Sequence, residues 1–177
     1  MNDPGPPPIV GKLNSDCLLA IATLMKRTGR EVQSEIRGTS MGTTIPDGSQ
    51  IHIRPLEAEA MLEGQVVAFF AGQSLRAHRI VYRGKGGRLG KYLLTLGDGW
   101  LYCDPPVHVS AALGLVTEYC VNGVWCAPAA LPGRSRADQR KADLNVAFIR
   151  SCMWFNIRWA QWIAKKLSEL TGAPRPA

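Results

Sequence analysis

Hydrophobic and polar residues follow a helical period near the N-terminus and a strand period over most of the middle of the chain. A helix is predicted from about Asn14 to Thr28, because apolar residues recur there on one helical face. Asn14, Ser15 and Asp16 are suitable N-cap residues, and Gly29 stands just past the predicted end. The apolar face of this helix comprises Leu18, Ile21, Ala22 and Met25.

After Gly29 the apolar residues alternate with polar ones, which is typical of strands. Short alternating or apolar segments predict strands at 32–38, 50–54, 65–70, 75–83, 92–96, 113–119 and 123–126. Turns are predicted at 71–74 and 84–87, and Asn122-Gly123 is a hairpin signal. Many short strands joined by glycine-containing turns indicate a mainly β (α+β) domain of barrel or folded-sheet type.

Two proline-containing stretches divide the chain. Residues 1–12 are predicted to be a disordered tail, and residues 128–143 a linker between the β domain with its leading helix (13–127) and a last segment (144–171). That last segment is predicted to be one long amphipathic helix, with aromatic residues beside its apolar stripe. It either packs on the β domain or a partner, or makes peripheral membrane contact, with tryptophans at headgroup level and basic residues toward anionic lipid.

Composition narrows the class of protein. A chain of 177 residues with 46% hydrophobic residues is long enough for one globular domain with a full core. The net charge of +7 suits an anionic partner, although part of it lies in the basic stretch predicted to be a solvated linker. A nucleic-acid partner has charge alone in its favour, and we therefore do not expect one.

Membrane spans, disulfides and metals are not expected. No apolar run approaches the roughly 20 residues that span a bilayer, so the protein is expected in the cytoplasm or peripherally at a membrane, without a transmembrane anchor. The five cysteines are odd in number and form no Cys-x-x-Cys pair, which argues against a zinc site or a disulfide framework. We expect neither a metal nor another cofactor.

Three polar residues could form a nucleophile, a base and an acid. Ser40 follows a predicted strand, His78 lies within another, and Asp104 follows the strand at 92–96. A hydroxyl needs a base within hydrogen-bond reach, and that base needs an orienting acid. Taken singly, each residue is more often a turn or core residue, and His52 and His108 are competing bases. The order Ser, His, Asp is allowable, but spacing alone does not show proximity.

The motifs around these residues resemble the signal peptidase I family of serine peptidases, which is related to LexA-type repressors. The matching blocks are Gly38-x-Ser40-Met41, Ile45-x-x-Gly48, Gly64-x-Val66-Val67, His78-Arg79-Ile80-Val81, Gly97-Asp98 and Asp104. The family divides into members with a Ser–Lys pair and archaeal and endoplasmic-reticulum members with His as the base. His78 occupies the position of the base, so the chain resembles the Ser–His branch.

This resemblance implies a folded-sheet peptidase domain in which Ser40, His78 and Asp104 are catalytic. Asp98, Gly38 and Met41 would be supporting residues, and the substrate would be an extended peptide or protein precursor. Thr43 stands where the family usually has proline, and Gln65 where it usually has aspartate. Gly38 stands where some members have a hydroxyl, so backbone donors must hold the oxyanion.

The sequence therefore leaves two hypotheses. The first is a serine endopeptidase that cleaves a precursor by a Ser–His–Asp mechanism. The second is a catalytically inactive interaction module of the same fold, which binds a partner through its last helix. The absence of a helix-turn-helix pattern before the β domain disfavours a LexA-type repressor.

Overall fold

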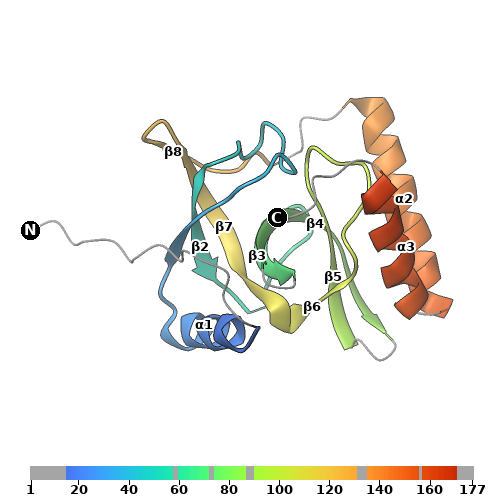
Figure 1. Cartoon of the computed structure of the whole chain (residues 1–177), viewed down its shortest axis with the longest axis horizontal. Helices are drawn as coiled ribbons and strands as arrows, with labels where there is room; N and C mark the ends of the chain where they lie inside the picture. The colour runs from blue at the N-terminus through green and yellow to red at the C-terminus, as the bar shows by residue number, and fades with distance from the viewer. Residues whose placement is uncertain are drawn as a thin grey trace, which may run out of the picture.

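One curled antiparallel sheet organises the protein (Figure 1). The computed structural model describes residues 15–57, 60–71, 74–86, 90–130, 135–155 and 157–170. Within these residues the sheet has eight strands in the order β1-β2-β7-β3-β4-β5-β6, with β8 paired to β7. The strands are β1 (Val32–Glu35), β2 (Gln50–Pro55), β3 (Val66–Ala71), β4 (Ser74–Gly86), β5 (Gly90–Leu96), β6 (Val107–His108), β7 (Ala112–Val121) and β8 (Val124–Cys126). The predicted mainly β class is confirmed.

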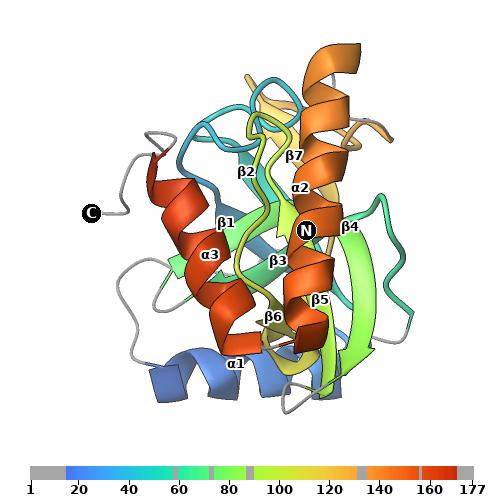
Figure 2. The ribbon, with the colours of Figure 1, turned by 90° about the vertical axis from the view of Figure 1, so that its right-hand side faces the viewer.

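Helices pack against two parts of the sheet (Figures 1 and 2). The described helices are α1 (Ser15–Thr28), a 3-10 turn η2 (Val109–Ala111), α2 (Arg136–Phe155) and α3 (Ile157–Leu170). Figure 2 shows α2 and α3 side by side as an antiparallel pair, and Figure 1 shows this pair beside β4 and β5. None of the described helices combines the length and apolar character that crossing a bilayer requires.

Local sequence signals explain several element boundaries. Gly29 ends α1 with a φ of +63°, and its N–H donates to the carbonyl of Met25 at 2.9 Å. Asn122 and Gly123 both have positive φ, at 53° and 81°, as a type I′ turn between β7 and β8 requires. The predicted helix at the N-terminus and the predicted hairpin are thus confirmed. Residues 1–14, which include the predicted tail and Asn14, lie outside the described residues.

The prediction that strand β4 ends before Gly84 is wrong. Strand β4 continues through Gly84 to Gly86, where a turn was predicted. A Cβ atom at Gly84 would overlap the ring of Tyr92, so this glycine permits close packing within the sheet rather than a reversal of the chain. Residues 72–73 and 87–89, on which the predicted turns partly fall, are not described.

The predicted C-terminal helix is two helices rather than one. Helix α2 begins at Arg136, within the predicted linker, and α3 covers the remainder. Both helices bury small or apolar residues against the outer side of β5, so folding back lets each contribute to one core. That core contains Tyr92, Leu94, Leu96, Cys103, Ala142, Ile149, Cys152, Ala160 and Ala164. Of the predicted linker, residues 131–134 are not described.

Two further clusters line the sheet. One joins Met25 of α1 to Ile36, Met41 and residues of β2, β3 and β7. The other includes Val67, Phe69, Ile80 and Leu93. Alternation along β3 and β4 sends neighbouring side chains to different clusters, since Ala77 belongs to the first and Ile80 to the second. This alternation fixes the direction of His78 and Arg79, which lie between them.

Candidate active site

Ser40, His78 and Asp104 form one continuous chain of hydrogen bonds. The Ser40 hydroxyl lies 2.8 Å from His78 Nε2. On the other side of the imidazole, His78 Nδ1 lies 2.5 Å from Asp104 Oδ2. His78 and Asp104 are almost fully buried, at 2% and 4% exposure, whereas Ser40 is partly exposed. The structure thus brings together the three residues predicted to be catalytic.

The register of the sheet positions the base and the acid. His78 lies in β4 opposite Val67 of β3, and two residues later Ile80 pairs with Thr95 of β5. The backbone N–H of Asp104 donates to the carbonyl of Thr95 at 2.8 Å, which anchors the acid beside this strand. The three central strands β3, β4 and β5 therefore fix the separation of His78 and Asp104.

A tight turn after β1 presents the hydroxyl of Ser40. Gly38 has a φ of +112°, a conformation that disfavours a side chain, and its N–H donates to Asp47 Oδ1 at 2.6 Å. Gly99 N–H donates to the carbonyl of Ser40 at 2.8 Å. A Cβ atom at Gly97 would overlap that same carbonyl, so only glycine permits this contact. Gly97 of the predicted Gly-Asp motif therefore packs directly against the turn that carries Ser40.

Asp104 accepts hydrogen bonds from three side chains. Besides His78, Thr95 Oγ1 donates to Oδ2 at 2.8 Å, and Arg76 Nη1 donates to Oδ1 at 3.2 Å. Burial alone would raise the pKa of Asp104, but the charge of His78, the hydrogen bonds from His78 and Thr95, and the charge of Arg76 together hold this pKa below its ordinary value. Asp104 is therefore a carboxylate that orients His78.

Aromatic rings and α2 enclose the base and the acid. The rings of Phe69 and Trp100 lie edge-on to His78, with centroids 5.9 Å and 5.4 Å away. The side chain of Asn145 in α2 accepts a hydrogen bond from the N–H of Cys103 at 2.9 Å, next to Asp104. Burial raises the pKa of the Cys103 thiol to about 12, so this neighbouring thiol is not a thiolate nucleophile.

The predicted supporting residues have partners in the segments that carry the triad. Asp98 forms a buried bidentate ion pair with Arg79, with distances of 2.9 Å and 2.6 Å. Met41 is buried in the core cluster next to α1, and Gly38 shapes the serine turn. Their placement indicates structural support for the loops that carry Ser40 and Asp104.

The two competing histidines have partners elsewhere. His52 stacks on Trp125 at a centroid distance of 3.9 Å and lies 3.4 Å from Glu118. His108 Nδ1 lies 2.6 Å from the hydroxyl of Ser110. Neither histidine is bonded to Ser40, so His78 is the base that the structure favours.

Sequence reasoning missed Arg76, Thr95 and Asn145. Arg76 had a usable signal, because it stands two residues before His78 in a strand and therefore shares its face. The partners of Thr95 and Asn145 depend on the arrangement of separate elements, which no local pattern predicts. Among the described residues, no group of three His, Cys, Asp or Glu residues has a metal-binding arrangement.

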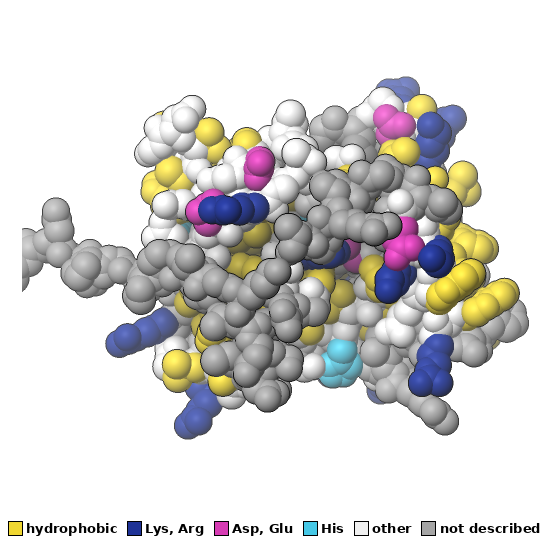
Figure 3. Space-filling model, in the orientation of Figure 1, with side chains coloured by type: hydrophobic (Ala, Val, Ile, Leu, Met, Phe, Trp, Pro, Cys, Tyr) yellow, Lys and Arg dark blue, Asp and Glu magenta, His cyan; other side chains and the backbone are white. Residues whose placement is uncertain are grey.

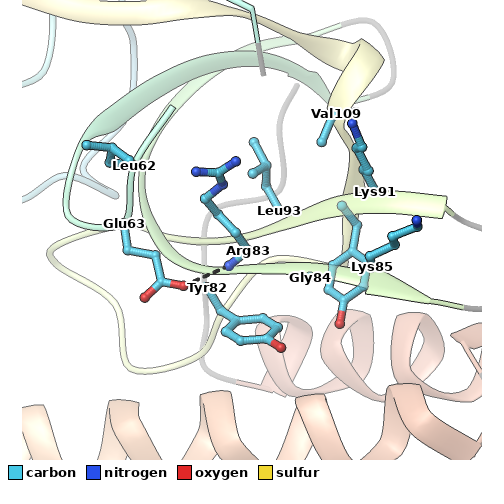
Figure 4. Close-up of a pocket in the computed structure, with 10 residues that line it drawn as sticks. Leu62, Glu63, Tyr82, Arg83, Gly84, Lys85, Lys91, Leu93 and Val109 are labelled. Carbon is cyan, nitrogen blue, oxygen red and sulfur yellow. Dashed lines mark hydrogen bonds between the residues drawn. The ribbon is translucent and has the colours of Figure 1, made fainter. Parts of the chain in front are cut away.

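An open pocket of about 600 Å³ lies along β4 and β5, away from these residues (Figure 4). It is lined by Leu62, Glu63, Tyr82, Arg83, Gly84, Lys85, Lys91, Tyr92, Leu93 and Val109. Glu63 accepts a hydrogen bond from the N–H of Arg83 at 3.0 Å across its rim. Ser40, His78 and Asp104 do not line this pocket, so the pocket is separate from the candidate active site.

Searches against models of known families and against curated proteins both find no match. A serine hydroxyl bonded to an imidazole, which is bonded in turn to a buried carboxylate, can lose its proton as it attacks an electrophilic carbon. The arrangement is suited to acyl transfer.

Proposed function

We propose that this protein is a serine endopeptidase with a fold and mechanism similar to those of the Ser–His branch of signal peptidase I. The observation that carries the proposal is the unbroken chain from Ser40 through His78 to Asp104. The motif resemblance supports the peptide bond as the bond that is cleaved. The curled antiparallel sheet is compatible with that family's folded-sheet domain.

In the first half of the reaction, Ser40 Oγ attacks the scissile carbonyl carbon while His78 Nε2 takes the hydroxyl proton. Asp104 holds the Nδ1–H of His78 and stabilises the imidazolium that forms. His78 then gives its proton to the leaving amine as the carbon–nitrogen bond breaks. Water attacks the resulting ester while His78 Nε2 accepts one of its protons. As the bond between the carbon and Ser40 Oγ breaks and the acid product leaves, His78 returns this proton to Oγ.

Backbone groups of the serine turn are suited to hold the oxyanion. Within the part of the chain that the structure describes, the N–H of Ser40 donates no hydrogen bond to another protein group. Loss of one oxyanion donor typically costs about 3 kcal/mol in the transition state, so such a donor matters. Gly38 adds open space beside it, since no atom outside Gly38 and its two chain neighbours lies within 4 Å of the position of a Cβ there.

The substrate is an extended segment of a peptide or protein precursor. An extended substrate backbone can contact the partly exposed Ser40 from the solvent side. It need not enter the interior where His78 is buried, so the sheet does not have to unfold. The partly exposed ring of Trp100 narrows the surroundings of the imidazole, which disfavours large side chains next to the scissile bond. The proposed processing activity therefore acts on small residues in an accessible segment.

A peptide-library digestion read by mass spectrometry tests this proposal. The wild-type protein is compared with Ser40→Ala and His78→Ala, and His108→Ala is the matched histidine control. We expect the wild type and the His108→Ala variant to make the same cuts, because His108 bonds to Ser110 rather than to Ser40. The Ser40→Ala and His78→Ala variants are expected to make none of them.

The outcomes are distinguishable. Cuts common to all four proteins would indicate a contaminating protease. If folded wild-type protein cuts no member of the library, the peptidase proposal is contradicted in favour of the interaction module. Retention of activity in Ser40→Ala would exclude Ser40 as the nucleophile whatever the substrate.

A further inference from the structure

The helix pair α2–α3 exposes large apolar side chains on the side away from the sheet. Trp154 is 90% exposed, Trp159 61% and Trp162 56%. Leu144 and Phe148 of α2 are also exposed. The opposite side of both helices is buried against β5, so this outward set, which we call the aromatic face, is not required for the core. Exposed aromatic residues gathered on one face indicate a contact surface.

Basic residues surround the aromatic face. Seven exposed Lys and Arg residues lie on α2 and α3, against three acidic residues. The basic residues are Arg136, Arg140, Lys141, Arg150, Arg158, Lys165 and Lys166. Arg158 and Lys166 each stand four residues from Trp162, so they share its side of α3. Figure 3 shows dark blue and yellow side chains next to one another at the right-hand edge, where α2 and α3 lie in Figure 1.

The tip of the β4–β5 hairpin adds positive charge at one end of this face. Lys85 and Lys91 are opposite each other in the register of the two strands, and both are exposed. Figures 1 and 2 both show this tip beside the end of α2 and the start of α3. Arg150 of α2 lies 3.9 Å above the ring of Tyr82 in β4, which joins the helix pair to the hairpin.

We propose that the aromatic face docks on the surface of a membrane that contains anionic lipids. Tryptophan suits this role because its ring enters the headgroup region while its N–H stays hydrated. Lysine and arginine beside it are attracted by lipid phosphates and by anionic headgroups. The proposal concerns attachment alone and does not depend on peptidase activity.

The composition of the face favours lipid over a protein partner. Protein interfaces are enriched in tryptophan and arginine but depleted in lysine, and their centres contain few charges. Here seven basic residues, three of them lysines, accompany the tryptophans, so this surface carries more charge than the centre of a protein interface. Indole side chains interspersed with lysines match a helix lying at a headgroup layer, where each cation stays hydrated.

Vesicle sedimentation with the full chain tests the proposal. The vesicles are pure phosphatidylcholine or an about two-to-one mixture of phosphatidylcholine and phosphatidylglycerol. We expect the wild type to bind the mixed vesicles at least about tenfold more tightly, with binding that weakens as salt rises. The double variant Trp154→Ala/Trp162→Ala is expected to lose about tenfold in affinity for the mixed vesicles. Trp125→Ala, which removes an exposed tryptophan from β8 on the other side of the sheet, is expected to bind like the wild type.

A second measurement on the wild type guards against effects of the variants on folding. Brominated phosphatidylcholine in the mixed vesicles should quench the tryptophan fluorescence, because the exposed indoles enter the lipid layer. Equal binding to both kinds of vesicle, wild-type binding by the double variant, or absence of quenching would each overturn the proposal. Repeating the assay with Ser40→Ala separates attachment from catalysis, since its binding should be unchanged.

Discussion

His78 and Arg79 are neighbours on β4, yet each pairs with a different buried aspartate on opposite faces of the sheet. His78 pairs with Asp104, and Arg79 with Asp98. Both aspartates lie in the segment that follows β5. The two pairs therefore share a strand, a loop and a low exposure to solvent, and they differ in what else they contact.

Every donor of Arg79 is occupied within the protein. A guanidinium has five N–H donors. Two of those of Arg79 bind Asp98, and the others bind the carbonyls of Gly64, Ala129 and Ala130. With all five donors bound, Arg79 cross-links β4, the loop after β5 and the segment before α2.

His78 differs from Arg79 because one of its two partners, the Ser40 hydroxyl, can be replaced during a reaction. Its Nε2 atom contacts the partly exposed hydroxyl of Ser40 and is placed to take the proton of that hydroxyl during attack. The comparison teaches that burial and an aspartate partner do not by themselves make a reactive site. What distinguishes the candidate site is a titratable group that connects the acid to an accessible nucleophile.

The largest expected effect comes from Asp104→Asn. The asparagine preserves the shape of the acid but favours the wrong tautomer of His78, so kcat is expected to fall on the order of 10⁴-fold. That decrease corresponds to about 5 kcal/mol in the activation free energy. Steady-state cleavage of a substrate peptide identified in the library digestion measures the change.

The companion variant Asp98→Asn sharpens this prediction. The folded fraction of this variant should retain a much larger part of the wild-type kcat than Asp104→Asn does. Equal losses of kcat in the two variants, with both proteins folded, would mean that the two ion pairs do not have separate roles.

The free energy of unfolding is expected to fall more in Asp98→Asn than in Asp104→Asn, which is the reverse of the order expected for kcat. Asp98→Asn leaves the buried charge of Arg79 without its carboxylate, which typically destabilises a protein by about 3–5 kcal/mol. Urea unfolding followed by circular dichroism measures the free energy of unfolding. Glu35→Gln is the control, because it breaks the exposed ion pair to Arg37 and should not measurably change stability. An effect of Asp98→Asn as small as that of the control would contradict the cross-link.

Much of the sheet follows from local pattern. Alternation predicted β2 because one of its faces lies in the core, with Ile51 and Ile53 fully buried. Strand β5 was predicted as a short apolar segment, and its residues are buried on both faces of the sheet. The end of β4 was missed because Gly84 suggests a turn, whereas its role is to accommodate the ring of Tyr92. A glycine needed for packing between strands cannot be distinguished locally from a glycine needed for a turn.

The start of α2 had a signal that the linker prediction overlooked. Ser135 caps this helix, because its hydroxyl accepts a hydrogen bond from the N–H of Asp138 at 3.1 Å and donates one to Asp138 Oδ2 at 2.8 Å. The division into α2 and α3 had no such signal, because the apolar stripe continues across both helices. Their antiparallel packing follows from a shared need to cover β5, which is a tertiary effect.

The candidate site was predictable as a set of residues but not as a geometry. The motif resemblance named Ser40, His78 and Asp104, whereas their contacts depend on the order of β3, β4 and β5 in the sheet. That order involves strands far apart in sequence, and β7 separates β2 from β3. Spacing along the chain carries no information about such neighbours.

A smaller effect is expected from Arg76, the residue that gives the His78–Asp104 pair an additional charge. Arg76→Met removes a cation from Asp104, so the carboxylate stabilises a protonated His78 more strongly. The acid limb of kcat/KM should therefore move to higher pH, by less than about one unit. Arg76→Lys should restore most of the wild-type profile. An unchanged limb in Arg76→Met would show that this partly exposed cation does not influence the base.

The smallest effect concerns the stability of the fold in acid. The pKa of Asp104 in the folded protein lies below its ordinary value of 3.8, because His78, Thr95 and Arg76 together outweigh the effect of burial. The carboxylate therefore contributes stability that is fully present above that value and is lost as pH falls through the lower folded pKa. Asp104→Asn cannot titrate, so the difference in unfolding free energy between wild type and variant should shrink below pH 3.8. Urea unfolding of both proteins across this range measures it, and a difference that stays constant would mean that the contacts to Asp104 do not favour its charged form.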